Sequence, residues 1–280
     1  MTTRTKKLPS KKKTVLCLRT VKTDGTACNG FKWPSLGFVE APDWEPTVEC
    51  GNGLHGYLHG CGDANSIEWD GLFQVVMVIK SEIIDLGGKV KFPRCEVIFT
   101  GNQKDATDIL VKEYGRGSKV IGATVVVNGE RQHAIAGDRG TAISAGYGGM
   151  ATAGYYGTAT SAGYRGTATA GYRGTAMAGY YGTATSAGYD GTATSGYDGT
   201  AMAGDGGKAM AGDYGTATAG RYGMATAEYD GTATAGDEGR ISILCWDGKR
   251  KREVIGYIGE NGLEPNVSYK LNNRHKFVKA

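Results

Sequence analysis

The sequence has no long hydrophobic run. No stretch of its 280 residues approaches the roughly 20 consecutive apolar residues of a transmembrane helix, so we expect no membrane-spanning segment. Residues 1–13, MTTRTKKLPSKKK, contain Arg4 and five lysines but no acidic residue and no apolar core, which is unlike a secretory signal. We therefore expect a disordered basic tail in a cytoplasmic chain, with the compartment otherwise unknown. The alternative role of this tail is contact with nucleic acid or another anionic partner.

Cysteine is scarce, and its six positions lack the rhythm of a disulfide framework, so we expect reduced thiols. The densest group of metal-ligand types lies in CGNGLHGYLHGC, which contains Cys50, His55, His59 and Cys61. Two thiols and two imidazoles suit zinc, but the spacing matches no standard finger and the glycines indicate a loop. We predict a structural turn without metal or cofactor. A zinc site, or a nucleotide or ADP-ribose pocket with His55 as a polar contact, are the alternatives.

Residues 14–115 have ordinary globular composition and no enzyme pattern that we recognise. TVLCLRTV, LFQVVMVIK and CEVIF predict strands, and DATDILVKEY predicts a short helix with Asp105 as a candidate cap. About 100 residues suffice for one small α+β domain. We therefore predict such a domain and no catalytic residues.

The chain does contain a strict internal repeat. Twelve units with the consensus G-T-A-T-A-G-Y-x lie within residues 140–239, nine of them octamers and three nonamers. The nonamers begin at Gly140, Gly157 and Gly182, and we assign their extra residues as Ser144, Ser161 and Ser186. Fixed self-similarity predicts a stacked-repeat architecture. Disorder is the alternative for so simple a composition, but a disordered segment has no reason to hold this phase.

Each unit predicts one short strand and one corner. Thr-Ala-Thr-Ala has the period of a strand, and Gly-Tyr-x-Gly turns the chain, with Gly free to adopt positive φ. The fold prediction is mainly β: a two-sided parallel β-solenoid of about six 16-residue coils, with Ala inside and Thr outside. At roughly 4.8 Å per coil the stack is about 29 Å tall. A linker and first partial coil over 116–139 precede it, and a C-terminal cap over 240–280 covers its open end.

The octamer A-G-Y-x-G-T-A-T resembles the A-G-Y-G-S-T-x-T octapeptide of bacterial ice nucleation proteins. WDGKRKR (246–252) and GENGLEPNVSY (259–269) resemble the C-terminal cap of the same family. The resemblance covers about residues 132–280 and does not extend to the N-terminal half. It implies a β-solenoid, outward Thr-x-Thr rows that order water as ice, and a tyrosine ladder.

With two units per coil, alternate units share a face. The threonine face has ten Thr among twelve outward positions and no charge, whereas the opposite face has seven Thr and also Lys208. A flat, regular, uncharged Thr array is what an ice-binding face needs, so we predict that the threonine face contacts ice or ordered water. The predicted ice-binding residues are Thr152, Thr167, Thr169, Thr183, Thr185, Thr200, Thr216, Thr218, Thr232 and Thr234.

The corner residues also separate by parity into two edges. The first, called here the tyrosine edge, is the more continuous, with Asp213 as its interruption. We predict self-association into a homo-oligomer through this edge or through the basic run of the cap; stacking within one molecule is the alternative. The predicted residues are Tyr147, Tyr164, Tyr180, Tyr197 and Tyr229, with Lys249, Arg250, Lys251 and Arg252.

The function predicted is therefore non-enzymatic and ice-nucleation-like, acting through the threonine face. The rival interpretation is a rigid spacer that presents the N-terminal domain to a protein or nucleic-acid partner. Thr is a good residue for any exposed strand, which would explain Thr-rich units without ice. It explains less well why charge is excluded from one face.

Overall fold

The computed structural model describes residues 13–280, so most of the predicted basic tail lies outside the described residues. The chain divides into two compact units, with the boundary between Thr124 and Val125. None of the helices within the described residues has the length and apolar character needed to cross a membrane.

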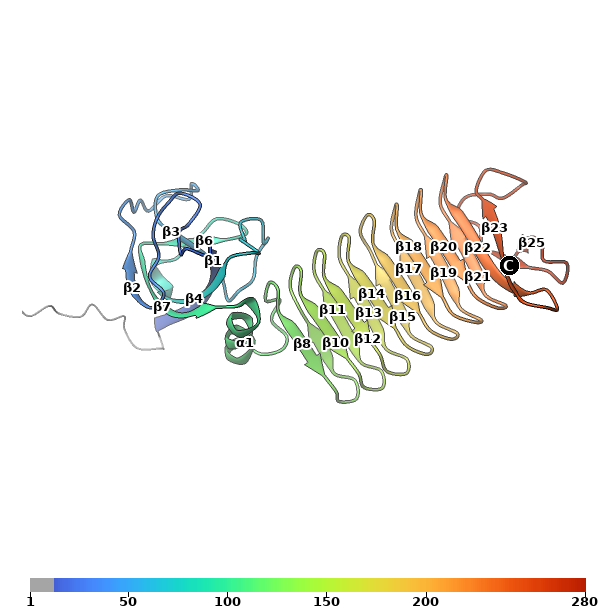
Figure 1. Ribbon diagram of the computed structural model, residues 1–280, viewed down its shortest axis with the longest axis horizontal. Helices are drawn as coiled ribbons and strands as arrows, with labels where there is room; N and C mark the ends of the chain where they lie inside the picture. Colours follow the sequence, from blue (N-terminus) through green and yellow to red (C-terminus); the bar gives the residue numbers. More distant parts are fainter. Residues whose placement is uncertain (1–12) are drawn as a thin grey trace, which may run out of the picture. The chain divides into compact units, whose positions relative to one another are not determined.

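The N-terminal unit is built on one antiparallel sheet of seven strands in the order β2-β7-β4-β1-β3-β6-β5 (Figure 1). A 3-10 turn, η2 (Lys80–Glu82), follows β4, and the helix α1 (Gln103–Tyr114) lies against β1, β4 and β7. The strands are β1 (Thr14–Val21), β2 (Gly37–Glu40), β3 (Leu54–Leu58), β4 (Leu72–Ile79), β5 (Ile84–Asp85), β6 (Val90–Phe92) and β7 (Arg94–Gly101). The predicted small α+β domain is present.

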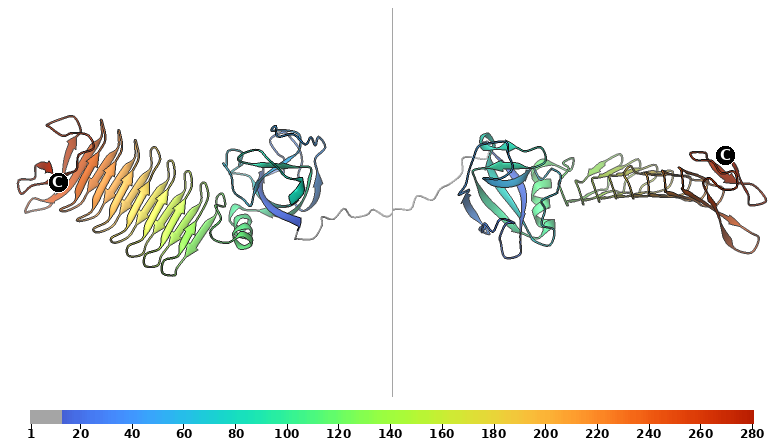
Figure 2. Two further views of the ribbon diagram at one scale, coloured as in Figure 1. Left: turned by 180° about the vertical axis from the view of Figure 1, so that it is seen from behind. Right: turned by 90° about the horizontal axis from the view of Figure 1, so that it is seen from above.

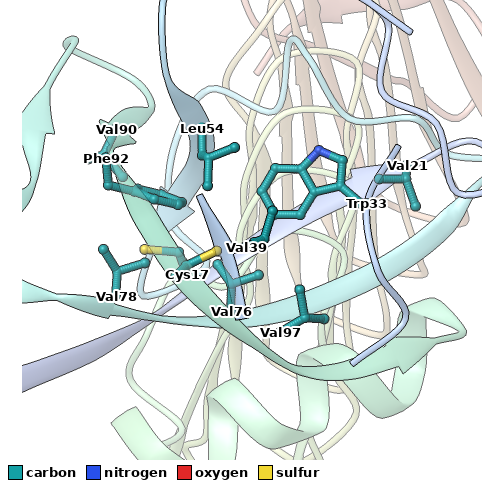
Figure 3. Close-up of a cluster of buried hydrophobic side chains, with 11 residues drawn as sticks. Cys17, Val21, Trp33, Val39, Leu54, Val76, Val78, Val90, Phe92 and Val97 are labelled. Carbon is teal, nitrogen blue, oxygen red and sulfur yellow. The ribbon is translucent and has the colours of Figure 1, made fainter. Parts of the chain in front are cut away.

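The core of this unit lies around Trp33, which is 4% exposed. Figure 3 shows its ring among Val21, Val76 and Val97, with Leu54 nearby. These side chains come from different strands and from the loop between β1 and β2. Burial of such apolar side chains is the main stabilising contribution in a domain of this size.

Two local expectations in this unit are wrong. Asn102, not Asp105, caps α1: its side chain accepts a hydrogen bond from the Asp105 N–H at 2.9 Å, and its amide donates to the Asp105 carboxylate at 2.8 Å. The Gly-rich stretch after Cys50 is not only a turn, because Leu54–Leu58 is a strand between β1 and β6. Glycine serves close packing there: a Cβ on Gly56 would lie 3.1 Å from the Leu18 carbonyl oxygen.

The C-terminal unit is a two-sided β-solenoid of about seven turns (Figure 1). Its even sheet contains β8 (Thr124–Val127), β10 (Thr141–Ser144), β12 (Thr158–Ser161), β14 (Thr175–Ala178), β16 (Thr192–Ser195), β18 (Lys208–Ala211), β20 (Met224–Ala227) and β22 (Arg240–Trp246). Its odd sheet contains β9 (His133–Ile135), β11 (Met150–Ala153), β13 (Thr167–Ala170), β15 (Thr183–Ser186), β17 (Thr200–Ala203), β19 (Thr216–Ala219) and β21 (Thr232–Ala235).

Each strand pairs in parallel with the strand two units further along, so two units make one turn, as predicted. Thr167 pairs with Thr183 after 16 residues, and Met150 pairs with Thr167 after 17. The nonamers absorb their extra residue in the corner. Ser186 takes the place of an inner Ala, opposite Ala170, and the exposed Ala187 is the additional residue. The assignment of Ser as the extra residue was therefore wrong.

The space between the two sheets is filled mainly by alanine. The Ala at the second position of every repeat strand is at most 1% exposed, as at Ala168 and Ala184, while the Thr side chains point outward. Seen from above in Figure 2 (right), this unit is correspondingly thin. Only small side chains fit between sheets this close together.

The open end of the solenoid is closed by the last forty residues. β22 continues the even sheet in parallel with β20 and then pairs antiparallel with β23 (Lys251–Tyr257). β24 (Tyr269–Leu271) pairs antiparallel with β21 at the end of the odd sheet, and β25 (Phe277–Lys279) pairs with β24. A reversal of strand direction ends the parallel stack and covers its unpaired edge.

Candidate functional site

The outward Thr side chains of the odd sheet form two parallel rows. The parallel pairing places the first residue of each strand beside the first residue of the neighbouring strand, and the third residue beside the third. One row is Met150, Thr167, Thr183, Thr200, Thr216 and Thr232, and the other is Thr152, Thr169, Thr185, Met202, Thr218 and Thr234. All ten predicted Thr residues therefore lie on one sheet.

The two ends of this array differ from its middle. Thr234 is only 8% exposed, and its hydroxyl lies 2.9 Å from that of Ser268 in the cap. The Thr152 hydroxyl lies 2.9 Å from the Nε2 of His133 on β9. Between them the Thr side chains are half-buried or exposed, and Met202 is 38% exposed in the centre of one row. The open array therefore runs from β13 to β19 and part of β21.

The opposite face of the solenoid is less regular. Its outward positions include Ile143, Met177, Met210 and Met224, and Lys208 stands on β18 between Thr192 and Met224. An ammonium group is strongly hydrated, and it breaks the chemical uniformity of the even sheet at its centre.

The corners between the strands have a backbone conformation that differs from the one expected from the sequence. In every unit the residue after the Tyr position has positive φ, as in Arg165 (58°), Tyr181 (54°) and Tyr214 (60°). The expectation that the motif glycines adopt this conformation is wrong. Those glycines instead allow close approach: a Cβ on Gly174 would lie 2.7 Å from the Ala170 Cβ. A backbone hydrogen bond to the next coil, such as Tyr181 N–H to the Tyr197 carbonyl at 2.9 Å, stabilises the corners up to Tyr222.

These corners bring a chain of tyrosine rings together along the tyrosine edge. Tyr147 stacks on Tyr164 at 5.7 Å, Tyr164 contacts Tyr181 at 4.9 Å, and Tyr181 contacts Tyr197 at 6.0 Å between ring centroids. Tyr180 also stacks on Tyr197, at 6.1 Å. Tyr181 was not among the predicted ladder residues; it stands at the position after the repeat Tyr and reaches the same ladder through its left-handed backbone.

Asp213 does not interrupt this ladder. Tyr214 contacts Tyr197 at 5.3 Å and Tyr229 at 6.1 Å, so it bridges the position that Asp213 occupies. The Asp213 carboxylate meanwhile accepts a hydrogen bond from the Tyr229 N–H at 3.1 Å. The tyrosine edge is therefore continuous from Tyr147 to Tyr229.

The other edge carries charge among its rings. Tyr172 contacts Tyr155 at 5.8 Å, while Arg173 pairs with the Asp190 carboxylate at 3.0 Å. Further along, the Arg221 guanidinium lies 4.8 Å from the centre of the Tyr222 ring. This edge is a mixed polar surface rather than an aromatic strip.

The basic run of the cap is partly neutralised. It forms the turn and first residues of the β22–β23 hairpin, where Asp247 accepts hydrogen bonds from the backbone N–H groups of Lys249 and Arg250, each at 2.8 Å. The Arg252 guanidinium donates to the same carboxylate at 2.6 Å, and Lys251 lies 3.6 Å from Glu228. The side chains of Lys249 and Arg250 therefore remain the more available cations of this run.

The four candidate metal ligands do not form one cluster. Cys50 is exposed before β3, His55 lies on β3, and the His59 ring packs on Tyr114 at 4.3 Å between ring centroids. Within residues 13–280, His, Cys, Asp and Glu side chains form no group of three or more that could hold a metal ion. Burial and nearby Lys89 lower the pKa of His55, and burial followed by Lys80 lowers that of His59. Absence of metal stays a prediction.

The fold and these surfaces define a class: a two-sided parallel β-solenoid with a Thr-rich face and a tyrosine ladder. Comparison with known proteins points to one group. An ice nucleation protein of Pseudomonas fluorescens is 40% identical over 100 residues, which are 34% of this chain and 8% of that protein. Ice nucleation proteins of Xanthomonas campestris pv. translucens (36% over 100 residues, 34% and 6%) and Pantoea ananas (InaA, 35% over 101 residues, 35% and 8%) are also similar.

This similarity confirms the resemblance to ice nucleation proteins and is confined to part of each protein. The matched part spans about a third of this chain and less than a tenth of each of these three relatives. No family model matches the chain, and no solved structure matches it. The chain is thus similar to ice nucleation proteins over about a third of its length.

Proposed function

We propose that the solenoid is a non-enzymatic ice- or water-binding element, and that the open Thr rows of the odd sheet make the contact. The observation that carries this proposal is the register of those rows. Pairing at 16 or 17 residues places Thr beside Thr in successive strands. The similarity to proteins named ice nucleation protein supports the same function.

The spacing of the hydroxyl groups suits an ordered water layer. Two outward Thr in one strand lie about 6.8 Å apart, and neighbouring strands of a sheet lie about 4.8 Å apart. A hydroxyl both donates and accepts hydrogen bonds, so each Thr can hold water without imposing one orientation. The outward residues of the odd sheet from β11 to β21 are all Thr or Met, so these rows carry no charge.

The even sheet provides a matched comparison within the same molecule. It has the same strand length, the same Ala core and the same stacking, but Lys208 and several large apolar side chains replace Thr. If any exposed solenoid sheet bound ice, both faces would do so equally. We therefore propose that ice activity resides on the odd sheet.

The experiment places charge on one face at a time. One variant carries Thr183→Lys and Thr216→Lys on the odd sheet, and its control carries Thr158→Lys and Thr192→Lys on the even sheet. Ice-plane binding and droplet freezing are measured for both variants and for wild type, after circular dichroism has shown that all three are folded. Loss in the odd-sheet variant with activity kept in the control is the expected result.

Equal loss in both variants would contradict the assignment to one face. Absence of ice activity even in concentrated wild type would contradict the proposal that the solenoid binds ice. A rigid spacer presenting the N-terminal unit to a protein or nucleic-acid partner would then be the better account of the solenoid.

A further inference from the structure

The N-terminal unit contains a cavity of about 340 Å³ that the solenoid's function does not use. Its walls come from β1, β3 and the loops around residues 26–33, 42–43 and 50–53. Apolar and aromatic side chains form part of the lining, among them Val21, Phe31, Trp33, Leu54 and Tyr57. A cavity of this size is in the range that holds small organic molecules.

The side chain of Arg19 lines this cavity and is buried, with 8% of the residue exposed. Its guanidinium lies 3.2 Å from the centre of the Trp33 ring, and two of its nitrogens donate to the carbonyls of His55 and Thr20, each at 3.2 Å. Among the described residues no carboxylate forms an ion pair with Arg19. Its Nε has no hydrogen-bond partner.

A buried guanidinium without a counter-ion is unfavourable, because desolvation is not offset by an opposite charge. Burial lowers the pKa of Arg19 to about 9, so the group remains protonated at neutral pH. The planar fork of Arg matches the geometry of carboxylate and phosphate groups, so a bound anion would supply the missing charge. Asp43 and Glu68 also line the cavity, but neither is paired with Arg19.

Two further features favour an anion here. The Nε2 of His55, on β3, is buried without a partner, and Lys22 and Lys89 also line the cavity. The buried Lys91 side chain also fixes the loop that carries Cys50 and Gly51. Its ammonium donates to the Glu49 carbonyl at 2.8 Å and to the Gly51 carbonyl at 3.4 Å.

We propose that this cavity binds a small organic anion, with a phosphate or carboxylate group at Arg19 and a flat or apolar body against the aromatic lining near Trp33. Figure 3 shows the Trp33 ring beside Val21 and close to Leu54, two residues that also line the cavity. The anionic group supplies the counter-charge that no carboxylate among the described residues provides to Arg19. The site is independent of the solenoid and of any ice activity.

The test uses probe pairs that differ in their anionic group and is performed on the full chain by isothermal titration calorimetry in low-salt buffer. Adenosine 5′-monophosphate with adenosine tests the phosphate source, and nicotinate with nicotinamide tests the carboxylate source. We expect at least one anionic probe to bind with a dissociation constant below about 1 mM and its neutral partner to bind at least about tenfold more weakly.

Arg19→Gln should weaken binding of that anionic probe at least about tenfold, whereas Arg116→Gln, an exposed residue outside the cavity, should leave it unchanged. Lys89→Gln, at another lining cation, gives a second variant if Arg19→Gln fails to fold, and a smaller loss is expected. Failure of both anionic probes to bind, equal binding of the neutral partners, or unchanged affinity in a folded Arg19→Gln variant would overturn the proposal.

Discussion

The inner alanines set the distance between the two solenoid sheets. Each repeat strand contributes one Ala at its second position that is at most 1% exposed, such as Ala159, Ala176 and Ala184. Methyl groups from the two sheets fill the space between the sheets, and no larger side chain occupies these second positions in the repeats. The thin core leaves little room for relaxation, because protein interiors are already close-packed.

Ala184→Leu should therefore lower the free energy of unfolding by roughly 1–3 kcal/mol or more, because added methylenes overpack the core. The matched control is Ala187→Leu in the same unit, where the Ala is exposed in a corner and a change within about 0.5 kcal/mol is expected. Denaturant unfolding followed by circular dichroism measures both. A similar effect of the two substitutions would contradict the tight packing of Ala184 between the sheets.

Two buried serines at the ends of repeat strands differ in their hydrogen bonds. The Ser186 hydroxyl donates to the Gly174 carbonyl at 2.9 Å, whereas the Ser195 hydroxyl is buried without a partner. Ser186→Ala should cost about 1 kcal/mol, and Ser195→Ala should be neutral or stabilising, because it removes an unsatisfied polar group. Equal thermal shifts in the two variants would show that Ser195 has a partner in solution.

At the scale of the element, the backbone conformation of the corner determines which tyrosine rings are in contact. Tyr181 has positive φ and contacts both Tyr164 and Tyr197, whereas Tyr222, with a similar φ of 57°, is accompanied by Arg221 on the other edge. Aromatic pairs contribute about 0.5–1.5 kcal/mol each. Tyr181→Ala should therefore reduce solenoid stability by about 1 kcal/mol or more and by more than Tyr222→Ala, measured by chemical unfolding. The opposite order would argue against a ladder that passes through Tyr181.

The β22–β23 hairpin depends on one carboxylate. The hydrogen bond from Arg252 and those from the N–H groups of Arg250 and Lys249 lower the pKa of Asp247 from 3.8 to about 2. Since the folded pKa lies below the unfolded one, the stabilisation is present above about pH 4 and is lost as pH falls toward 2.

The backbone amide resonances of Lys249 and Arg250 should consequently titrate with a midpoint near pH 2, the folded pKa of Asp247. Nuclear magnetic resonance of the full chain measures this, and Asp247→Asn, which cannot ionise, is the control and should show no such titration. A midpoint near the ordinary value of an exposed Asp would show that the Arg252 contact does not persist in solution.

At the scale of the whole molecule, the proposed ice-binding array is small. Its open rows run over β13, β15, β17, β19 and part of β21, and at roughly 4.8 Å between neighbouring strands they are on the order of 20 Å long. An ice nucleus held by so small a patch rarely outgrows its own surface cost. Binding to existing ice should therefore be easier for the monomer than seeding new ice.

Droplet freezing should accordingly depend steeply on assembly. Monomeric and assembled fractions separated by size-exclusion chromatography should differ, with the assembled fraction freezing at the higher temperature at equal mass concentration. Tyr164→Ala with Tyr197→Ala tests the tyrosine edge, and Lys249→Gln with Arg250→Gln tests the basic run. Equal freezing by both fractions would contradict the size argument, and assembly unaffected by either variant would remove both proposed contacts.

Much of the solenoid could be predicted because its interactions repeat. A strand period of two places Ala168 and Thr169 on opposite sides, and a unit too short for a full turn requires two units per coil. Parity then assigns Thr167, Thr183 and Thr216 to one sheet without any structural information. The N-terminal unit was less predictable, since Leu54–Leu58 resembles a Gly-rich loop until its neighbours β1 and β6 are present.

The sequence by itself determined the period, the Ala core and the Thr-rich face, because these follow from side-chain size and alternation between near neighbours. The tertiary structure decided that Thr234 is covered by Ser268, that Tyr214 closes the gap at Asp213, and that Arg19 is buried without a carboxylate. Each of these depends on groups far apart in the chain or on a backbone conformation that local composition does not encode. Burial and contact across such separations are properties of the folded chain.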